Sequence, residues 1–401
     1  MAERYPGGVI SKTPPTVTPP VAGEGGSASG MWTLDTVLEY EKAGAWPKPP
    51  FPRELYGWGS NTLGQVGDDT VIARSSPVQI GSLTDWSLVA TGVYFSLATK
   101  LNNTMWGWGV NGSGNLGSNS TVNSSSPIQI GSLTNWHVVS CGNANSVAIK
   151  TDGTLWVWGG NGYGVLGDNT AVAKSSPIQI GAMSDWLKVS IIQSVSAIKT
   201  NGTLWTWGNN SFGQLGHNDV VNRSSPVQVG SLTTWQLASN GNLSVLALTV
   251  SGALFSWGEN THGQLGSNNR THRSSPVQVG ALTNWLSVSG GGEHSAAVKT
   301  DGTLWAWGQN TSGQVGDGTV IRRSSPVQVG SLTTWSAVSA GAFHNAAIKS
   351  DGTLWAWGDN ANGRLGDGTG VSRSSPVQIG ALGTWFIAAS GNNHTAAITK
   401  G

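Results

Sequence analysis

Three histidines recur at one position of a repeated sequence, which makes them candidates for metal ligands or for proton transfer. They are His294, His344 and His394, each 50 residues from the next. The same position in the other four copies holds Phe95, Asn145, Ser194 and Ser244. A metal needs ligands that converge on one point, whereas these histidines are one copy apart. We therefore expect each to make a local hydrogen bond at the start of a strand.

Acidic residues in some loops suggest a calcium-binding site. The motif Gly-Asp-Gly occurs at Asp317 and Asp367, but the matching positions include Ser118, His217 and Ser267. The spacing of a calcium-binding loop is missing. We also find no nucleophile–base pair, no carboxylate pair and no glycine-rich phosphate loop that opens a helix. The sequence therefore predicts a protein that is not an enzyme and uses no metal or other cofactor.

A row of cations precedes the motif Ser-Ser-Pro in six of the seven copies, with Ser124 in the remaining one. Such a ring could hold the carboxylates or sulfates of a glycan; alternatively, each cation braces its own loop against the neighbouring copy. Two aromatic residues nearby, which no repeat rule requires, could stack on a sugar. The candidate binding residues are Arg74, Lys174, Arg223, Arg273, Arg323, Arg373, Tyr163 and Phe212.

The composition limits the classes of partner. Charged residues make up 10% of the 401 residues and the formal net charge is +1, against about 25% charged residues in ordinary proteins. Neither nucleic acid nor an anionic membrane would be attracted by such a chain. The one cysteine, Cys141, excludes an internal disulfide. No secretory signal or membrane-spanning run is apparent, so we expect a soluble protein without membrane insertion.

The secondary-structure elements that hold these residues follow from a sequence repeat. Its period is 50 residues, with a single step of 49. Trp-Gly pairs begin at Trp58, Trp108, Trp158, Trp207, Trp257, Trp307 and Trp357. Within one copy, the segments "WSAVSAG", "HSAAVK", "TLWAW" and "PVQV" read as short strands, and Asp301-Gly302 is typical of a two-residue hairpin turn with positive φ angles. Four antiparallel strands repeated radially predict an all-β, seven-bladed β-propeller over residues 52–401, whose tryptophans form the core between blades.

The ends of the repeat region predict ring closure. The last copy ends at Thr399 without the strand that should follow, and the segment 54–59, "ELYGWG", supplies that strand at the other end of the region. The seventh blade should therefore contain strands from both ends, with Tyr56 and Ala397 in one sheet, which leaves no free edge.

Residues 1–51 form a separate N-terminal arm. The segment "SKTPPTVTPPVAGEGGSASG" is too rich in Pro, Thr and Gly to bury a core. The following "MWTLDTVLEYEKAG" suits one short helix, with Thr33 and Asp35 at its start and Gly44 at its end. We expect the arm to anchor the protein to a larger particle through Trp32, Leu34, Val37, Leu38 and Trp46.

The copies resemble the repeat of the regulator of chromosome condensation family. The resemblance rests on "WGNNSFGQLG" (207–216), "PVQV" (226–229) and "GGEHSAAVKTDG" (291–302), and it extends over about residues 52–401. It implies a seven-bladed propeller. Guanine-nucleotide exchange, the activity of the founding member, is not expected, because the position before the repeat histidine holds a single acid: Tyr94, Ala144, Gln193, Leu243, Glu293, Phe343 and Asn393.

The arm has a resemblance of its own. The phrases "ASGMWTLD" and "GAWP" resemble the openings of virion structural proteins of marine tailed bacteriophages. The resemblance implies a virion location, other virion proteins as partners of the arm, and a propeller, as a monomer or a homo-oligomer, that meets a host glycan or receptor as part of a tail fibre, head fibre or capsid decoration. The alternative is an intracellular protein-interaction scaffold.

Overall fold

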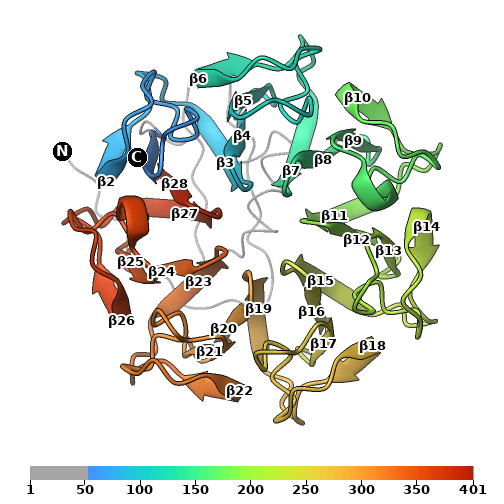
Figure 1. Ribbon diagram of the computed structural model, residues 1–401, viewed down its shortest axis with the longest axis vertical. Coiled ribbons are helices and arrows are strands. Elements are labelled where there is room, and N and C mark those ends of the chain that lie inside the picture. Colours follow the sequence, from blue (N-terminus) through green and yellow to red (C-terminus); the bar gives the residue numbers. More distant parts are fainter. Residues whose placement is uncertain (1–52, 401) are drawn as a thin grey trace, which may run out of the picture. The chain divides into compact units, whose positions relative to one another are not determined.

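The computed structural model describes residues 53–400, and these form seven four-stranded antiparallel sheets arranged around one axis (Figure 1). The sequence-based prediction of an all-β, seven-bladed propeller is confirmed. Blades 1–6 are consecutive along the chain: β3–β6, β7–β10, β11–β14, β15–β18, β19–β22 and β23–β26. Blade 7 consists of β27, β28, β1 and β2.

Each strand has a fixed place in its blade. The first and innermost strands are β3 (Trp86–Thr91), β7 (Trp136–Cys141), β11 (Trp186–Ile191), β15 (Trp235–Asn240), β19 (Trp285–Gly290), β23 (Trp335–Ala340) and β27 (Trp385–Ser390). The second strands are β4 (Phe95–Lys100), β8 (Asn145–Lys150), β12 (Ser194–Lys199), β16 (Ser244–Thr249), β20 (His294–Lys299), β24 (His344–Lys349) and β28 (His394–Thr399). The second strands are buried along their whole length.

The outer half of each blade holds the third and fourth strands. The third strands are β5 (Met105–Gly109), β9 (Leu155–Gly159), β13 (Leu204–Gly208), β17 (Leu254–Gly258), β21 (Leu304–Gly308), β25 (Leu354–Gly358) and β1 (Leu55–Gly59). The fourth strands are β6 (Ser124–Gln129), β10 (Lys174–Gln179), β14 (Arg223–Gln228), β18 (Arg273–Gln278), β22 (Arg323–Gln328), β26 (Arg373–Gln378) and β2 (Arg74–Gln79). Two short 3₁₀ turns, η1 (Gly162–Gly164) and η2 (Ala361–Gly363), lie between third and fourth strands.

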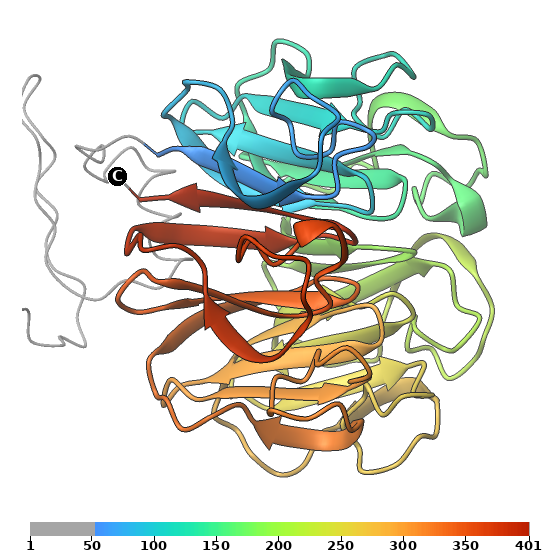
Figure 2. The same ribbon diagram turned by 60° about the vertical axis from the view of Figure 1, so that its left-hand side comes forward.

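The ring closes as the sequence predicts. Strand β1 pairs antiparallel with β28, and Tyr56 lies opposite Ala397. The side view shows this first strand of the described chain beside the last one (Figure 2). Because β1 is hydrogen-bonded to β28 on one side and to β2 on the other, neither edge of β1 is unpaired, and blade 7 combines strands from both ends of the repeat region.

Tryptophan side chains join neighbouring blades. In all seven blades the third strand carries the tryptophan of the Trp-Gly pair. Its indole Nε1 donates to a backbone carbonyl of the preceding blade, as Trp58 does to Arg364 O at 3.0 Å and Trp108 to Gln65 O at 3.0 Å. These tryptophans are fully buried. The first-strand tryptophan of each blade lies edge-on or tilted against them, with centroids 6.0–6.4 Å apart. The prediction that the tryptophans form the inter-blade core is confirmed.

The hairpin turn between second and third strands differs from the prediction. The N–H of Gly302 donates to Lys299 O at 2.9 Å, and Gly302 has φ +77° whereas Asp301 does not have a positive φ. The turn is therefore longer than the two-residue form, in which both central residues need a positive φ. The carboxylate of Asp301 stabilises this longer turn, because it accepts hydrogen bonds from the N–H and the hydroxyl of Thr303 at 3.0 and 2.6 Å.

Candidate interaction surface

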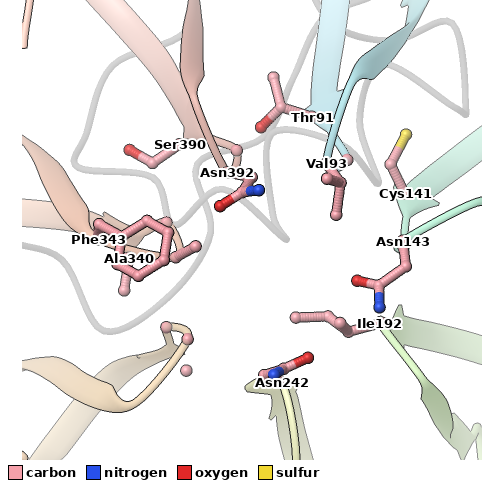
Figure 3. Close-up of a pocket in the computed structure, with 18 of the residues that line it drawn as sticks. Thr91, Val93, Cys141, Asn143, Ile192, Asn242, Ala340, Phe343, Ser390 and Asn392 are labelled. Carbon is pink, nitrogen blue, oxygen red and sulfur yellow. The ribbon is translucent and has the colours of Figure 1, made fainter. Parts of the chain in front are cut away.

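The turns between first and second strands surround the propeller axis at one end, which we call the axial mouth. A cavity of about 380 Å³ lies there, and all seven blades contribute to its lining. Figure 3 shows side chains from these turns around the opening. The lining includes the side chains of Val93, Asn143, Ile192, Asn242, Phe343 and Asn392.

Backbone hydrogen bonds join these turns into a ring. The N–H of Val93 donates to Gly142 O at 3.3 Å in the next blade, and corresponding bonds of 3.1–3.4 Å occur at five further junctions. The turn of blade 3 has two residues between its strands, 192–193, where its neighbours have three. Here Gln193 Nε2 donates to Asn242 Oδ1 at 2.7 Å instead. The shortened turn accounts for the single step of 49 residues, and the ring holds the rim in a fixed shape.

The chemistry of the axial mouth is that of amides and apolar groups. Within residues 53–400, Glu293 is the only charged residue in its lining, and its carboxylate lies 3.3 Å from His262 Nε2. Burial raises the pKa of the Cys141 thiol far above its ordinary value, so this group stays a thiol and not the nucleophilic thiolate. Apart from Glu293, the lining offers hydrogen bonds from amide groups and apolar contact.

The three repeat histidines lie just behind this rim, fully buried at the start of their strands as expected. Their hydrogen bonds, however, reach the next blade: Nε2 lies 2.9 Å from Asn345 Oδ1 for His294, 2.7 Å from Thr395 Oγ1 for His344 and 2.9 Å from Ser96 Oγ for His394. Burial lowers the pKa of His294 to about 4 and of His394 to about 3. The described residues contain no group of three or more His, Cys, Asp or Glu placed to hold a metal ion. The histidines therefore join blades 5, 6, 7 and 1.

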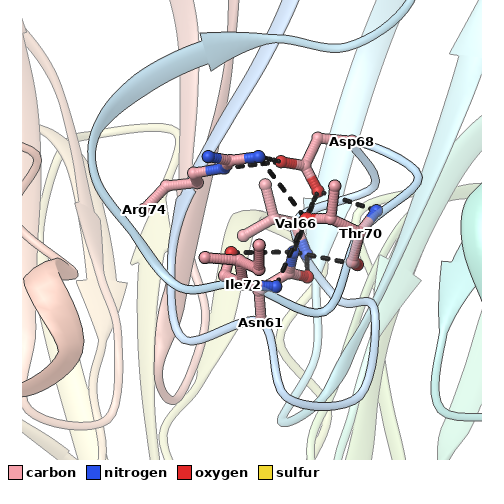
Figure 4. Close-up of polar contacts among 6 residues, drawn as sticks. All are labelled: Asn61, Val66, Asp68, Thr70, Ile72 and Arg74. Atoms are coloured by element: carbon pink, nitrogen blue, oxygen red, sulfur yellow. Dashed lines mark hydrogen bonds and ion pairs between the residues drawn. The ribbon is translucent and has the colours of Figure 1, made fainter.

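The loops between third and fourth strands, which we call the rim loops, surround the axial mouth on the same end of the blades. A buried asparagine organises each of them, and Figure 4 shows the example from blade 7. Asn61 Nδ2 donates to Asp68 Oδ1 at 2.9 Å and to Ile72 O at 3.1 Å, and Asn61 Oδ1 accepts from the N–H of Val66 at 2.9 Å. One side chain therefore fixes both arms of the loop.

The cation row lies at the end of these loops. Arg74 Nε donates to Asp68 Oδ2 at 2.6 Å. Burial on its own raises the pKa of Asp68, but hydrogen bonds from Thr70 and Arg74 and the charge of Arg74 outweigh it and hold the pKa below its usual value. The same kind of ion pair within one loop joins Lys174 to Asp168, Arg223 to Asp219, Arg323 to Asp317 and Arg373 to Asp367.

Five of the six cations thus brace their own loops, which is the alternative considered from the sequence. The loop in turn lies against the next blade, where the N–H of Asp69 donates to Ser125 O at 2.9 Å. Arg273 differs, because no hydrogen bond or ion pair of its side chain is found within residues 53–400. Glycan binding by this row stays a prediction.

The two aromatic candidates do not form one platform. The ring of Phe212 packs edge-on against His272 of the next blade, with centroids 5.2 Å apart. Tyr163 lies in η1 with φ +62°, and 60% of its surface is exposed. A tyrosine in this left-handed region is uncommon. In four other rim loops a glutamine two residues further on, such as Gln214, accepts from the backbone N–H of the matching residue, and Val165 cannot do so. Sugar stacking by this pair stays a prediction.

The anchoring residues predicted for the arm, Trp32, Leu34, Val37, Leu38 and Trp46, lie outside the described residues. The helix predicted around them lies there as well. Among the described helices, none is long and apolar enough to cross a membrane.

Sequence reasoning missed a set of buried lysines at the end of the blades opposite the axial mouth. Lys299 Nζ lies 3.6 Å from the ring centre of Trp305 and 4.7 Å from that of Trp285. Lys100, Lys150, Lys199 and Lys349 lie between two rings in the same way. A signal was present, since each of these lysines ends its strand and a tryptophan follows six residues later. These ammonium groups interact with aromatic faces and stabilise single blades.

The geometry defines the class of protein: a closed propeller with a rigid rim around an axial cavity. The model of the RCC1-like domain matches residues 181–401, and that of the regulator of chromosome condensation (RCC1) repeat matches residues 54–99, 102–149 and 152–197. The chain therefore belongs to the family of proteins with regulator of chromosome condensation repeats, as its sequence motifs indicated. A search of curated proteins finds no match.

Solved structures agree on the fold. The chain is similar to human WBSCR16, with 21% sequence identity and a TM-score of 0.79 over 86% of this chain and 98% of that one. It is equally similar to Prp20p of Saccharomyces cerevisiae, with 19% identity and a TM-score of 0.79 over 93% and 96% of the two chains. Yeast RCC1 (Prp20) in a crystal structure with Kap60 gives 19% identity and a TM-score of 0.79 over 95% and 96%.

Proposed function

We propose that this chain is a non-catalytic binding propeller whose axial mouth takes up part of a protein partner. The observation that carries the proposal is the lining of the mouth: amide side chains and apolar groups from seven blades, held by a ring of backbone hydrogen bonds. A rigid rim lowers the entropy cost of binding, because little of it has to be ordered when a partner docks.

Aromatic anchors strengthen this proposal. Phe343 lines the mouth and is 43% exposed, and Tyr94, in the matching turn of blade 1, is 39% exposed. Exposed aromatic residues beside a concave site are the residue types that dominate protein–protein binding energy. Both belong to the row of residues before the repeat histidine, and this row lies at the mouth, since Gln193, Glu293 and Phe343 are part of the lining.

The partners of two similar structures support a protein partner. One describes the binding of Prp20p to Gsp1p and histones, and the other describes Kap60 bound to yeast RCC1. We extend to this chain only the kind of ligand, a protein, and not the identity of any of these partners.

Capture experiments with matched variants test the proposal. The full chain is immobilised, proteins retained from a lysate of its source are identified by mass spectrometry, and the variant Phe343→Ala/Asn242→Ala is compared with Leu332→Ala. Leu332 is 46% exposed and lies in the connection before β23, at the opposite end of blade 6 from the mouth. We expect the first variant to lose the retained proteins and the second to keep them. Equal retention by both variants would refute the role of the mouth.

The location of the protein is a separate proposal. The virion location is supported by the resemblance of the arm, residues 1–51, and none of the relatives named above is described as a virion protein. An intracellular scaffold is supported by the similarity of the propeller to Prp20p. Mass spectrometry of purified phage particles separates the two: a stoichiometric chain supports the virion, and its absence from the particles supports the scaffold. Deletion of residues 1–51 should abolish incorporation, and incorporation without the arm would contradict its anchoring role.

A further inference from the structure

The rim loop of blade 4, residues 259–272, breaks a rule that the other six blades follow. Five loops carry both a cation before Ser-Ser-Pro and an aspartate that pairs with it. The loop of blade 1 carries neither, since Ser118 and Ser124 occupy the two positions. Blade 4 alone keeps the cation, Arg273, without an aspartate: Ser267 and Asn269 stand at the two positions that supply aspartates in the sibling loops.

The loss of the carboxylate leaves Arg273 without a partner in the described chain. Its Nε atom is shielded from solvent and has no hydrogen bond within residues 53–400, while the residue as a whole is half-buried. In three sibling loops the same Nε donates to an aspartate oxygen at 2.6–2.9 Å. A buried donor without an acceptor is costly, and for a charged group the cost is larger.

The surroundings of Arg273 add positive charge and donors. Arg270 and His272 are exposed in the same loop, and the stretch 266–273 contains no acid. His272 Nδ1 accepts the N–H of Asn260 at 2.9 Å, so the neutral ring carries its proton on Nε2 and can donate from there. The acids of the neighbourhood have partners: Glu259 accepts from the hydroxyl of Thr261, and Glu293 lies beside His262.

We propose that Arg273 is the centre of a binding site for a carboxylate of a protein partner, an aspartate or glutamate side chain that takes the place of the aspartate missing from this loop. The inference rests on the proposed function, because the carboxylate comes from a protein. The Arg273 site is a second contact for the partner. It lies at the same end of the propeller as the mouth, at the junction of blades 3 and 4, where Phe212 contacts His272. A carboxylate fits because the five sibling loops show this chemistry within the chain itself.

A peptide copied from a sibling loop is the probe. Acetyl-Asp-Gly-Thr-amide reproduces Asp317–Thr319, and acetyl-Asn-Gly-Thr-amide is its uncharged control. Binding to the full chain is measured by saturation-transfer NMR at low salt, for the wild type and for Arg273→Gln, Ser267→Asp and Arg323→Gln. Inorganic phosphate is the competing oxyanion.

We expect the Asp peptide to bind the wild type and Arg323→Gln, and to bind Arg273→Gln and Ser267→Asp at least about tenfold more weakly, since a charge-assisted contact is lost. Ser267→Asp restores the internal carboxylate and should also raise Tm, so loss of binding in this variant is not loss of folding. Equal binding of the Asp and Asn peptides, or unchanged binding to Ser267→Asp, would overturn the site. Tighter binding of phosphate than of the peptide would overturn its assignment to a carboxylate.

The experiment is independent of the axial mouth. Phe343→Ala should bind the Asp peptide like the wild type, whatever proteins it captures. Failure of the peptide assay therefore removes the Arg273 site alone, and failure of the capture experiment removes the proposed function of the mouth alone.

Discussion

The three buried histidines make the stability of the ring depend on pH in a defined window. Burial holds the pKa of His294 at about 4 and that of His394 at about 3, and it lowers that of His344 well below its usual value. An unfolded histidine has a pKa of about 6.5. Between pH 6.5 and about 4, the unfolded state therefore binds protons that the folded state does not. The free energy of unfolding must fall as the pH falls through this window.

The magnitude follows from the size of the shift. Each pH unit below the pKa of the unfolded histidine lowers the free energy of unfolding by about 1.36 kcal/mol per histidine, as long as the folded ring stays neutral. From pH 6.5 to 4.5 this amounts to about 2 kcal/mol for His294 and about 2 kcal/mol for His394, and His344 adds to the loss in the same direction. All three are fully buried, so solvent screening does not reduce these values much. The aspartates of the rim loops, whose pKa values lie below 3.8, act only at lower pH.

Urea unfolding followed by tryptophan fluorescence at pH 7.0, 6.5, 5.5 and 4.5 measures this effect. The matched variant replaces His294, His344 and His394 by the Asn or Ser that blades 2, 3 and 4 carry at this position. We expect the variant to be less stable at pH 7, because inter-blade contacts are altered, yet to lose much less stability between pH 6.5 and 4.5. A variant with the same pH dependence as the wild type would refute the argument that these buried imidazoles set it.

Three further perturbations test the packing described above. A Cβ added to Gly366, which has φ +81°, would lie 2.7 Å from Trp58 Nε1, whereas Gly380, with φ +63°, has open space at that point. Gly366→Ala should therefore cost about 3 kcal/mol through strain and overpacking together, and Gly380→Ala about 1 kcal/mol through strain alone. Equal thermal shifts of these two variants would contradict the difference. Lys299→Met should lower the free energy of unfolding by about 1 kcal/mol in urea titrations, because the cation's contact with two indole rings is lost; a neutral outcome would make these contacts incidental. Asn310→Ala should speed hydrogen exchange in the rim loop around Val315, whose N–H donates to Asn310 Oδ1 at 2.8 Å. Unchanged exchange there would mean that the loop holds its shape without the asparagine.

Much of the fold could be predicted because the same sequence motifs recur in each blade. The period of the Trp-Gly pairs gives the number of blades, and the unpaired segments at the two ends of the repeat give the closure through Tyr56 and Ala397. The prediction of a two-residue hairpin turn is wrong because the Asp-Gly dipeptide also suits a longer turn, in which the carboxylate of Asp301 bonds to Thr303.

The candidate site could be predicted only in part. The ion pairs of the rim loops have a signal in the sequence, since Asp68 precedes Arg74 by six residues and Asp317 precedes Arg323 by six. The partners of the histidines are one repeat and one residue away, as Asn345 is from His294, and that relation becomes visible only when neighbouring blades are placed side by side in space. The lining of the axial mouth shares a glycine in five blades, Gly92, Gly142, Gly291, Gly341 and Gly391, but its other side chains differ from blade to blade. The sequence therefore marks the turns and not the chemistry of the lining.

Site-specific cross-linking tests whether a protein partner binds at the axial mouth. A photoreactive phenylalanine analogue in place of Phe343 samples the axial mouth, and the same group in place of Leu332 samples the opposite end of the same blade. We expect cross-links to a protein partner from position 343 and none from position 332. Cross-links from position 332 alone would place the partner at the opposite end of the propeller and contradict binding at the axial mouth.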